Sequence, residues 1–369
     1  MTRLFFTRFF CLLTCLTTVA AHADKLDDDL QTVWESLWDQ RGTPRQVIRW
    51  DKPIWYRLHG TDTSRHRAHI ENALQAVSGI ARLELVDVSA QADAEAVARL
   101  DIEIVNDRAL QDNEPCNTQP VKWSNWVYEK VRVKMRSHDT WRCTFHEMMH
   151  VMGIAGHPSG KTVLSYFAHR RDRLMDLDQL MLEAWYSPAM PRGATPLEAL
   201  VVLTDAVARQ GNLGLSSEDA QGRTKLFNQR MLAQMESLAM GQGEVPSIVL
   251  RSGKASQEFI DNSQRITTYF VGLAYLKGVI APKDTVASSE WFKRSAHKGY
   301  SPGQVMWGRA LRDGLSVQPD KLTAHAWFTL AGRNGNAVGS ADLAALEKTL
   351  TPEELEKARG QLPPTLNPS

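Results

Sequence analysis

The sequence predicts a mixed α+β domain followed by an all-α domain of helical repeats. Strand-like and helix-like segments alternate between about residues 50 and 190, a pattern typical of a mixed domain. From about residue 195 the chain becomes rich in leucine and alanine, which favours helices. Near the C-terminus, a pattern of glycine and aromatic residues recurs after 36 residues, as it does in stacked helical hairpins.

The composition indicates a globular chain with room for about two domains. Of its 369 residues, 43% are hydrophobic and 23% are charged, which excludes disorder as a description of the whole chain. Lysine and arginine number 43 against 42 aspartate and glutamate residues, so the chain lacks the basic surplus of a dedicated nucleic-acid-binding protein. Four cysteines are too few for a disulfide-dense scaffold. Enzymes and binding proteins both remain open.

Residues 1–23 have the features of a secretory signal peptide. Arg3 and Arg8 give a positive start, and the apolar run that follows is shorter than the roughly 20 residues that span a bilayer. Small residues at Ala21 and Ala23 favour cleavage after Ala23. We therefore expect export to the periplasm or beyond, with no transmembrane segment in the mature chain. An uncleaved membrane anchor is the alternative.

Several segments between residues 24 and 190 have the periodicity of a single regular element. Residues 24–50, polar with scattered tryptophan and leucine, indicate a short helix. We expect an amphipathic helix over residues 64–79, where apolar residues recur at helical spacing, and a helix over 174–186 that closes the domain. The segments that predict strands are residues 54–58, 83–88, 100–105 and 131–135.

The cysteines indicate one disulfide. Cleavage of the signal peptide would remove Cys11 and Cys15 and leave Cys116 and Cys143. A single pair of cysteines in an exported chain predicts a bond between them, whereas two separate free thiols are the alternative.

The pattern His146-Glu147-x-x-His150 has the spacing of a zinc-binding helix. Residues four apart lie on one face of a helix, so both imidazoles can reach one metal ion. Glu147 lies about 100° around the helix, where its carboxylate can reach a metal-bound water without becoming a ligand. We expect this helix to begin at Asp139 or Thr140.

Gly153 and His157 complete the candidate site. Gly153 stands three residues after His150, where the helix must end. His157 would supply a third imidazole, and three histidines with one water make a complete catalytic zinc site. We therefore predict one Zn²⁺ ion, with His146, His150 and His157 as its ligands. The alternatives for the third ligand are Asp172, Asp176 and Asp178.

At these residues the chain resembles the metzincin clan of zincin metallopeptidases, over about residues 50–190. The clan pattern is H-E-x-x-H-x-x-G-x-x-H, and the sequence from His146 to Gly153 matches it position by position. The third histidine departs from it, because His157 comes one residue late and Gly156 stands in the clan's position. In the turn that follows, Leu164 stands where the clan has methionine.

The resemblance implies a zinc metallopeptidase that hydrolyses peptide bonds of a protein or peptide substrate. Glu147 would take a proton from the zinc-bound water and pass it to the leaving amine. Tyr166 matches a tyrosine that lies near the metal in the serralysin-like and astacin-like branches, and its hydroxyl would stabilise the oxyanion with the zinc. Two alternatives remain: an exported protein-binding scaffold with a structural or inactive metal site, and an amidase that acts on cell-wall peptide.

The C-terminal third contains an internal repeat. The segment from Gly272 to Gly278 returns from Gly308 to Gly314, and Asp284 returns as Asp320. This block resembles the Sel-one-like, tetratricopeptide-related repeat family, which implies a possible protein partner. We expect a metzincin-like domain over residues 24–240, a linker over 241–253 and the Sel-one-like repeats over 254–369.

Overall fold

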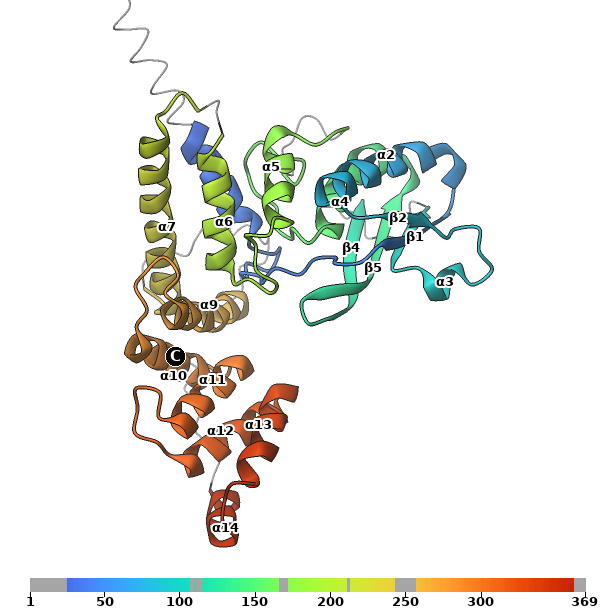
Figure 1. Ribbon diagram of the computed structural model, residues 1–369. Helices are drawn as coiled ribbons and strands as arrows, with labels where there is room; N and C mark the ends of the chain where they lie inside the picture. The colour runs from blue at the N-terminus through green and yellow to red at the C-terminus, as the bar shows by residue number, and fades with distance from the viewer. Residues whose placement is uncertain are drawn as a thin grey trace, which may run out of the picture. The chain divides into compact units, whose positions relative to one another are not determined.

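The computed structural model describes residues 25–106, 110, 115–165, 172–210, 213–242 and 257–361 (Figure 1). The predicted signal peptide therefore lies outside the described residues, as does most of the predicted linker. The chain divides into two compact units, which we call the N-terminal and C-terminal units. The division falls between Phe227 and Asn228, inside helix α7 (Ser217–Ala239), and residues 41–44 belong to the C-terminal unit.

The N-terminal unit is built on a five-stranded sheet with the order β2-β1-β3-β5-β4. Three neighbouring pairs are parallel, and β4 pairs antiparallel with β5 at one edge. The strands are β1 (Ile54–Gly60), β2 (Leu85–Asp87), β3 (Leu100–Val105), β4 (Cys116–Ser124) and β5 (Val127–Arg136). The four expected strands coincide with or overlap β1, β2, β3 and β5. The sequence did not predict β4, because its side chains are mostly polar and exposed and show no alternation.

Two helices pack on the sheet and on each other (Figure 1). Helix α2 (Thr63–Ala81) buries Ile70, Ala73, Leu74 and Val77, the apolar face that the sequence predicted. Helix α4 (Thr140–Val151) contacts both β4 and β5, so it lies over the antiparallel edge of the sheet. The shorter helix α3 (Ala94–Val97) contacts β1.

The N-terminal unit contains three further helical segments besides the first part of α7. They are a helix spanning residues 25–36, α5 (Asp176–Trp185) and α6 (Pro196–Ala208). The first was expected as a short helix, and it buries Leu26, Leu30 and Trp34. Trp34 packs edge-on against Trp38, with ring centroids 5.2 Å apart. The helix is therefore part of the core, although it follows directly after the predicted cleavage site.

The C-terminal unit is all-helical and repetitive. After α7 its helices are α9 (Gln257–Lys277), α10 (Thr285–His297), α11 (Ser301–Asp313), α12 (Lys321–Arg333), α13 (Ala337–Glu347) and α14 (Pro352–Gly360). Asp284 and Asp320, 36 residues apart, cap the N-termini of α10 and α12 by accepting hydrogen bonds from backbone N–H groups. The predicted helical-repeat architecture is confirmed.

The repeated glycines have a steric cause. A Cβ on Gly272 would lie 2.7 Å from the ring of Phe292, and a Cβ on Gly308 would lie 2.6 Å from the ring of Phe328. Each glycine thus lets an aromatic ring of the next helix approach the backbone, and the contact recurs once per repeat. Across the described residues, no helix combines the length and the apolar character that a membrane span requires.

Candidate metal centre

Helix α4 begins after Asp139 and ends before Gly153, as the sequence predicted. Gly153 has a φ of 103°, and a Cβ at this position would overlap the backbone carbonyl oxygen of Ile48. Only glycine satisfies both demands. The chain can therefore leave the helix one residue after Met152 and return toward its own last turn.

Three imidazoles meet beside α4. Nε2 of His146 lies 3.2 Å from Nε2 of His150, one helical turn later. Nε2 of His157, from the loop after Gly153, lies 3.1 Å from each of these two atoms. The structure thus brings together the three histidines that the sequence singled out, across the one-residue offset of His157. Within the described part of the chain, these three form the group able to hold a metal ion.

Backbone carbonyl groups place a proton on Nδ1 of two of these rings. Nδ1 of His146 donates to the carbonyl oxygen of Val163 over 2.9 Å, and Nδ1 of His150 donates to that of Ile154 over 2.7 Å. A proton held on Nδ1 leaves the lone pair on Nε2. Burial also lowers the pKa of the His150 imidazole to about 4, so this ring is neutral near pH 7.

This donor set fits a zinc ion. Imidazoles that carry a single proton on Nδ1 present lone pairs at Nε2 and cannot hydrogen-bond to each other through these atoms, yet Nε2 of His146 and Nε2 of His150 face one another at 3.2 Å. A shared cation removes that conflict. Tetrahedral ligands with Zn–N bonds of about 2.0–2.1 Å stand about 3.3–3.4 Å apart. The observed separations of 3.1–3.2 Å are close to this value.

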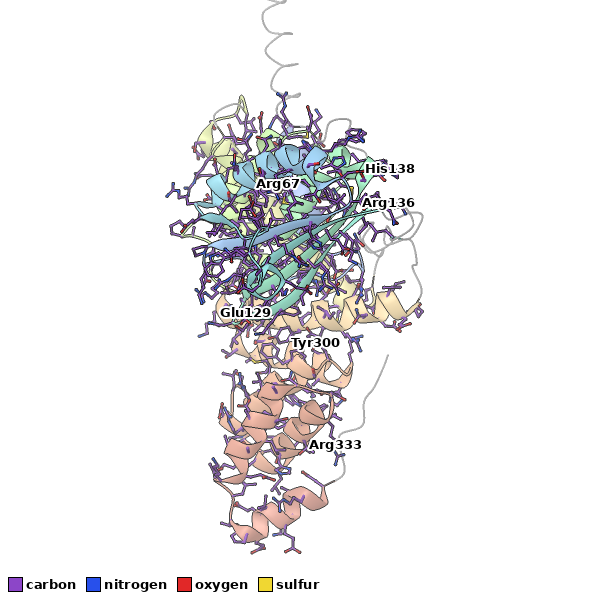
Figure 2. The ribbon with its side chains drawn as sticks, turned by 90° about the vertical axis from the view of Figure 1, so that its right-hand side faces the viewer. Arg67, Glu129, Arg136, His138, Tyr300 and Arg333 are labelled. Carbon is purple, nitrogen blue, oxygen red and sulfur yellow. A yellow bond between two sulfur atoms is a disulfide. The ribbon has the colours of Figure 1, made fainter. Side chains whose placement is uncertain are left out.

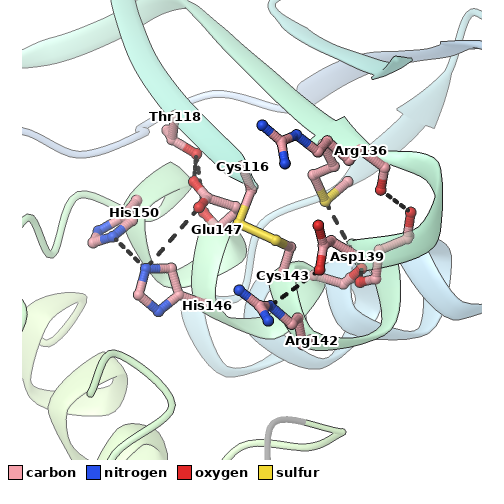
Figure 3. The surroundings of a disulfide bond; sticks show 12 residues. Cys116, Thr118, Arg136, Asp139, Arg142, Cys143, His146, Glu147 and His150 are labelled. Atoms are coloured by element: carbon pink, nitrogen blue, oxygen red, sulfur yellow. Dashed lines mark hydrogen bonds and ion pairs between the residues drawn. A yellow bond between two sulfur atoms is a disulfide. The ribbon is translucent and has the colours of Figure 1, made fainter. Parts of the chain in front are cut away.

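Glu147 lies beside the histidines and is 2% exposed. Its Oε1 is 4.0 Å from Nε2 of His146, whereas its Oε2 accepts a hydrogen bond of 2.5 Å from Oγ1 of Thr118 on β4 (Figure 3). One carboxylate oxygen is thus held by the edge strand, and the other faces the histidine cluster. This is the arrangement that a proton acceptor next to a metal requires.

The disulfide between Cys116 and Cys143 joins the same two elements (Figure 3). Cys116 precedes Thr118 by two residues on β4, and Cys143 precedes Glu147 by one turn of α4. The disulfide and the hydrogen bond therefore connect β4 and α4 at two successive levels. The predicted pairing is confirmed, and such a bond is typical of an oxidising environment outside the cytosol.

Asp178, one of the alternative metal ligands considered from the sequence, stabilises the turn at Val163 that supports His146. The fully buried carboxylate of Asp178 accepts hydrogen bonds from Oγ1 of Thr162 and from the backbone N–H groups of Val163 and Met175. Burial raises the pKa of Asp178 to about 6, although these bonds oppose the shift. Asp178 thus binds the backbone of Val163, whose carbonyl oxygen accepts the hydrogen bond from His146, and it is not part of the histidine group.

Three other residues near the predicted site are Leu164, Tyr166 and His138. Leu164, in the position where the clan has methionine, is fully buried. Tyr166 lies outside the described residues, so its predicted role stays a prediction. His138 is exposed, and its Nε2 is 3.2 Å from the carboxylate of Asp139. Figure 2 shows it close to Arg136, where β5 leads into α4.

The sequence did not single out Thr118, although a signal for it existed. Thr118 follows Cys116 by two residues, and Glu147 follows Cys143 by four. A strand and a helix joined by a disulfide bring their next same-face residues together. Once the cysteines were paired, the spacing therefore pointed to Thr118 as a neighbour of Glu147.

Comparison with known proteins yields little. No family model matches the chain, and no curated protein matches it. Among solved structures, the chain is similar to the crystal structure of c5321, a protective antigen present in uropathogenic Escherichia coli strains that displays an SLR fold. The two sequences are 17% identical, with a TM-score of 0.26 over 59% of this chain. The chain spans about half the length of that antigen, 51%.

Proposed function

We propose that this chain is an exported zinc metallopeptidase that hydrolyses peptide bonds. The observation that carries the proposal is the convergence of three Nε2 atoms within 3.2 Å of one another, with the carboxylate of Glu147 beside them. A purely structural zinc site has no need of a carboxylate that is close to the ligands but outside the ligand set. A catalytic site needs one.

The residues take distinct roles in this proposal. His146, His150 and His157 hold the ion, which when bound acts as a Lewis acid that acidifies water and polarises a carbonyl group. Glu147 accepts the proton of the attacking water at Oε1 and delivers it to the leaving amine. By resemblance to the metzincins, Tyr166 stabilises the negative charge that develops on the carbonyl oxygen.

The edge strand supports a protein or peptide as the substrate. β4 is the last strand of the sheet that the described residues form, and it pairs with β5 along one side. Its residues after Cys116 are mostly exposed, and the strand contacts α4, which carries Glu147. An extended peptide can pair with such an edge and pass the histidine cluster.

A second candidate function is an exported protein-binding scaffold in which the metal site is structural. The observation that favours it is the C-terminal unit, because stacked helical hairpins commonly bind protein partners. In the metallopeptidase proposal the same unit recruits a protein partner or substrate. An amidase that acts on cell-wall peptide would use the same centre on a different substrate.

Digestion of casein and of a peptide library tests these candidates. The zinc-loaded protein should cleave, a chelator should abolish cleavage, and Glu147→Gln should abolish cleavage while the bound zinc remains. His146→Ala should lose the zinc by elemental analysis, whereas the control His138→Ala should retain it, because His138 is exposed and paired with Asp139. A zinc-loaded protein that cleaves neither substrate would refute the peptidase and favour the scaffold. Release of cell-wall peptide from purified peptidoglycan alone would identify the amidase.

A further inference from the structure

The loop that carries His157 packs against residues 31–40, more than a hundred residues earlier in the chain. The backbone N–H of Gly156 donates to the carbonyl oxygen of Ser36 over 3.0 Å. The backbone N–H and the hydroxyl group of Ser159 both donate to Oε2 of Glu35, over 2.8 and 3.0 Å. Residues on both sides of His157 are therefore bound to one short segment, which we call the N-terminal clamp (residues 31–40).

Glu35 is the central residue of the N-terminal clamp. It is 3% exposed, and its other carboxylate oxygen accepts a hydrogen bond of 3.1 Å from Gln31. A buried carboxylate is stabilised only by such partners, so the loop must adopt the conformation that delivers both Ser159 donors. The contact thus restrains the loop at Ser159.

The loop packs so closely on the N-terminal clamp that two of its glycines have no space for a side chain. A Cβ on Gly156 would overlap the carbonyl oxygen of Glu35, and a Cβ on Gly160 would overlap the hydroxyl group of Thr32. Gln40, at the end of the N-terminal clamp, brings its Nε2 to 3.4 Å from Nε2 of His157. The N-terminal clamp therefore contacts the loop on both sides of the ligand and reaches the ligand itself.

The other two histidines need no such support. His146 and His150 are fixed by the backbone of α4 and by hydrogen bonds to Val163 and Ile154. His157 lies on a loop that contains glycine at positions 153, 156 and 160, and such a loop has many conformations open to it. The direction in which the His157 side chain points must therefore be set by a partner outside the loop.

We propose that the N-terminal clamp controls the zinc affinity of the centre by holding His157 in the ligand position. This inference rests on the proposed zinc site. Before residues 31–40 dock on the loop, the chain offers two histidines, and after docking it offers three. The N-terminal clamp begins eight residues after the predicted cleavage site, so loading of the metal depends on folding of the new N-terminus of the exported protein.

Measurement of the zinc dissociation constant tests the inference, with a chromogenic chelator as competitor and the full mature chain as the protein. Glu35→Ala should weaken zinc binding by about 10–100-fold, the range for loss of a residue that orients a ligand. The matched control is Asp29→Asn on the same helix, because Asp29 pairs with Lys25 at 2.6 Å within that helix. Zinc affinity within twofold of wild type in folded Glu35→Ala would overturn the inference.

Two further measurements separate positioning from a general role in stability. Thermal unfolding of the metal-free variants reports their stability. If Glu35 had a structural role alone, its loss would lower the stability and leave the zinc affinity of the folded protein unchanged. The visible spectrum of bound Co²⁺ reports coordination, and loss of His157 from the site should weaken the intense bands of a four-coordinate ion. An unchanged Co²⁺ spectrum in Glu35→Ala would contradict the inference.

Ser159→Ala covers the case in which Glu35→Ala does not fold. Ser159 is exposed, and this change removes one of the two hydrogen bonds to Glu35 and leaves the backbone bond in place. We expect a smaller loss of zinc affinity, about threefold to tenfold; an affinity equal to wild type would count against the N-terminal clamp. If wild type itself binds no zinc, the proposed function fails, and this inference fails with it.

Discussion

Oγ1 of Thr118 donates a 2.5 Å hydrogen bond to Oε2 of Glu147, and so connects the edge strand to the residue next to the first histidine. The hydroxyl group occupies one carboxylate oxygen and leaves the other 4.0 Å from His146. The hydrogen bond restrains rotation of the carboxylate, which makes Thr118 a positioning residue for Glu147.

Substitution of Thr118 tests that role. Thr118→Val keeps the shape of the side chain and removes the donor, and hydrogen bonds to charged groups contribute about 1.5–3 kcal/mol. We expect turnover to fall about tenfold or more while bound zinc, measured by elemental analysis, stays at the wild-type level. Thr118→Ser retains the hydroxyl group and should stay close to wild type. Full turnover in Thr118→Val would show that Glu147 needs no partner on β4.

The disulfide should contribute strongly to stability. Cys116 and Cys143 are separated by 27 residues, and closure of a loop of this length in the unfolded chain corresponds to about 3.5 kcal/mol. Denaturant unfolding of Cys116→Ser with Cys143→Ser should show a loss of this size relative to wild type. The reducing agent that destabilises wild type should leave the double variant unchanged. A double variant as stable as wild type would mean that the bond adds nothing to β4 and α4.

Asp178 predicts a pH dependence of stability. Its pKa rises to about 6 in the folded chain from about 3.9 in the unfolded chain, so the folded state binds the proton more tightly between these values. The stability that Asp178 contributes is therefore fully present below about pH 4 and is lost as the pH rises through about 6. The size of the change is about 3 kcal/mol.

A comparison with Asp178→Asn isolates this effect. The amide does not titrate, so the difference in unfolding free energy between wild type and variant should move in favour of the variant as the pH rises from about 4 to 7. Denaturant unfolding of the metal-free proteins at several pH values measures it. A difference that does not change with pH would mean that Asp178 keeps its ordinary pKa in the folded chain.

Two glycines, one in close contact with a ring and one in open space, predict opposite results for alanine substitution. Gly308→Ala places a methyl group 2.6 Å from the ring of Phe328 and should destabilise the C-terminal unit by about 1–3 kcal/mol. Gly222→Ala, at an exposed position of helix α7, places a methyl group with no atom within 4 Å and should stabilise by up to about 1 kcal/mol, because alanine favours helices. Thermal unfolding distinguishes the two. Equal shifts would refute the steric account of the repeat.

Much of the local structure followed from periodicity. The apolar spacing in α2 and the alternation in β3 are local signals, and the helix that carries His146 was expected with its first residue at either Asp139 or Thr140. The sequence did not predict strand β4, because an exposed edge strand buries neither face and so shows no alternation of apolar and polar residues. The position of Tyr166 lies outside the described residues.

The side chains able to hold a metal could be named from the sequence alone, because the spacing of His146 and His150 and the turn at Gly153 are properties of one helix and its end. The sequence also predicted the pairing of the two cysteines. The sequence offered His157 as the third ligand beside three aspartates, and the folded chain shows that the late histidine reaches the other two, on a loop that is bound to Glu35. Contacts between distant segments leave no periodic trace in a single sequence, so they could be found only in three dimensions.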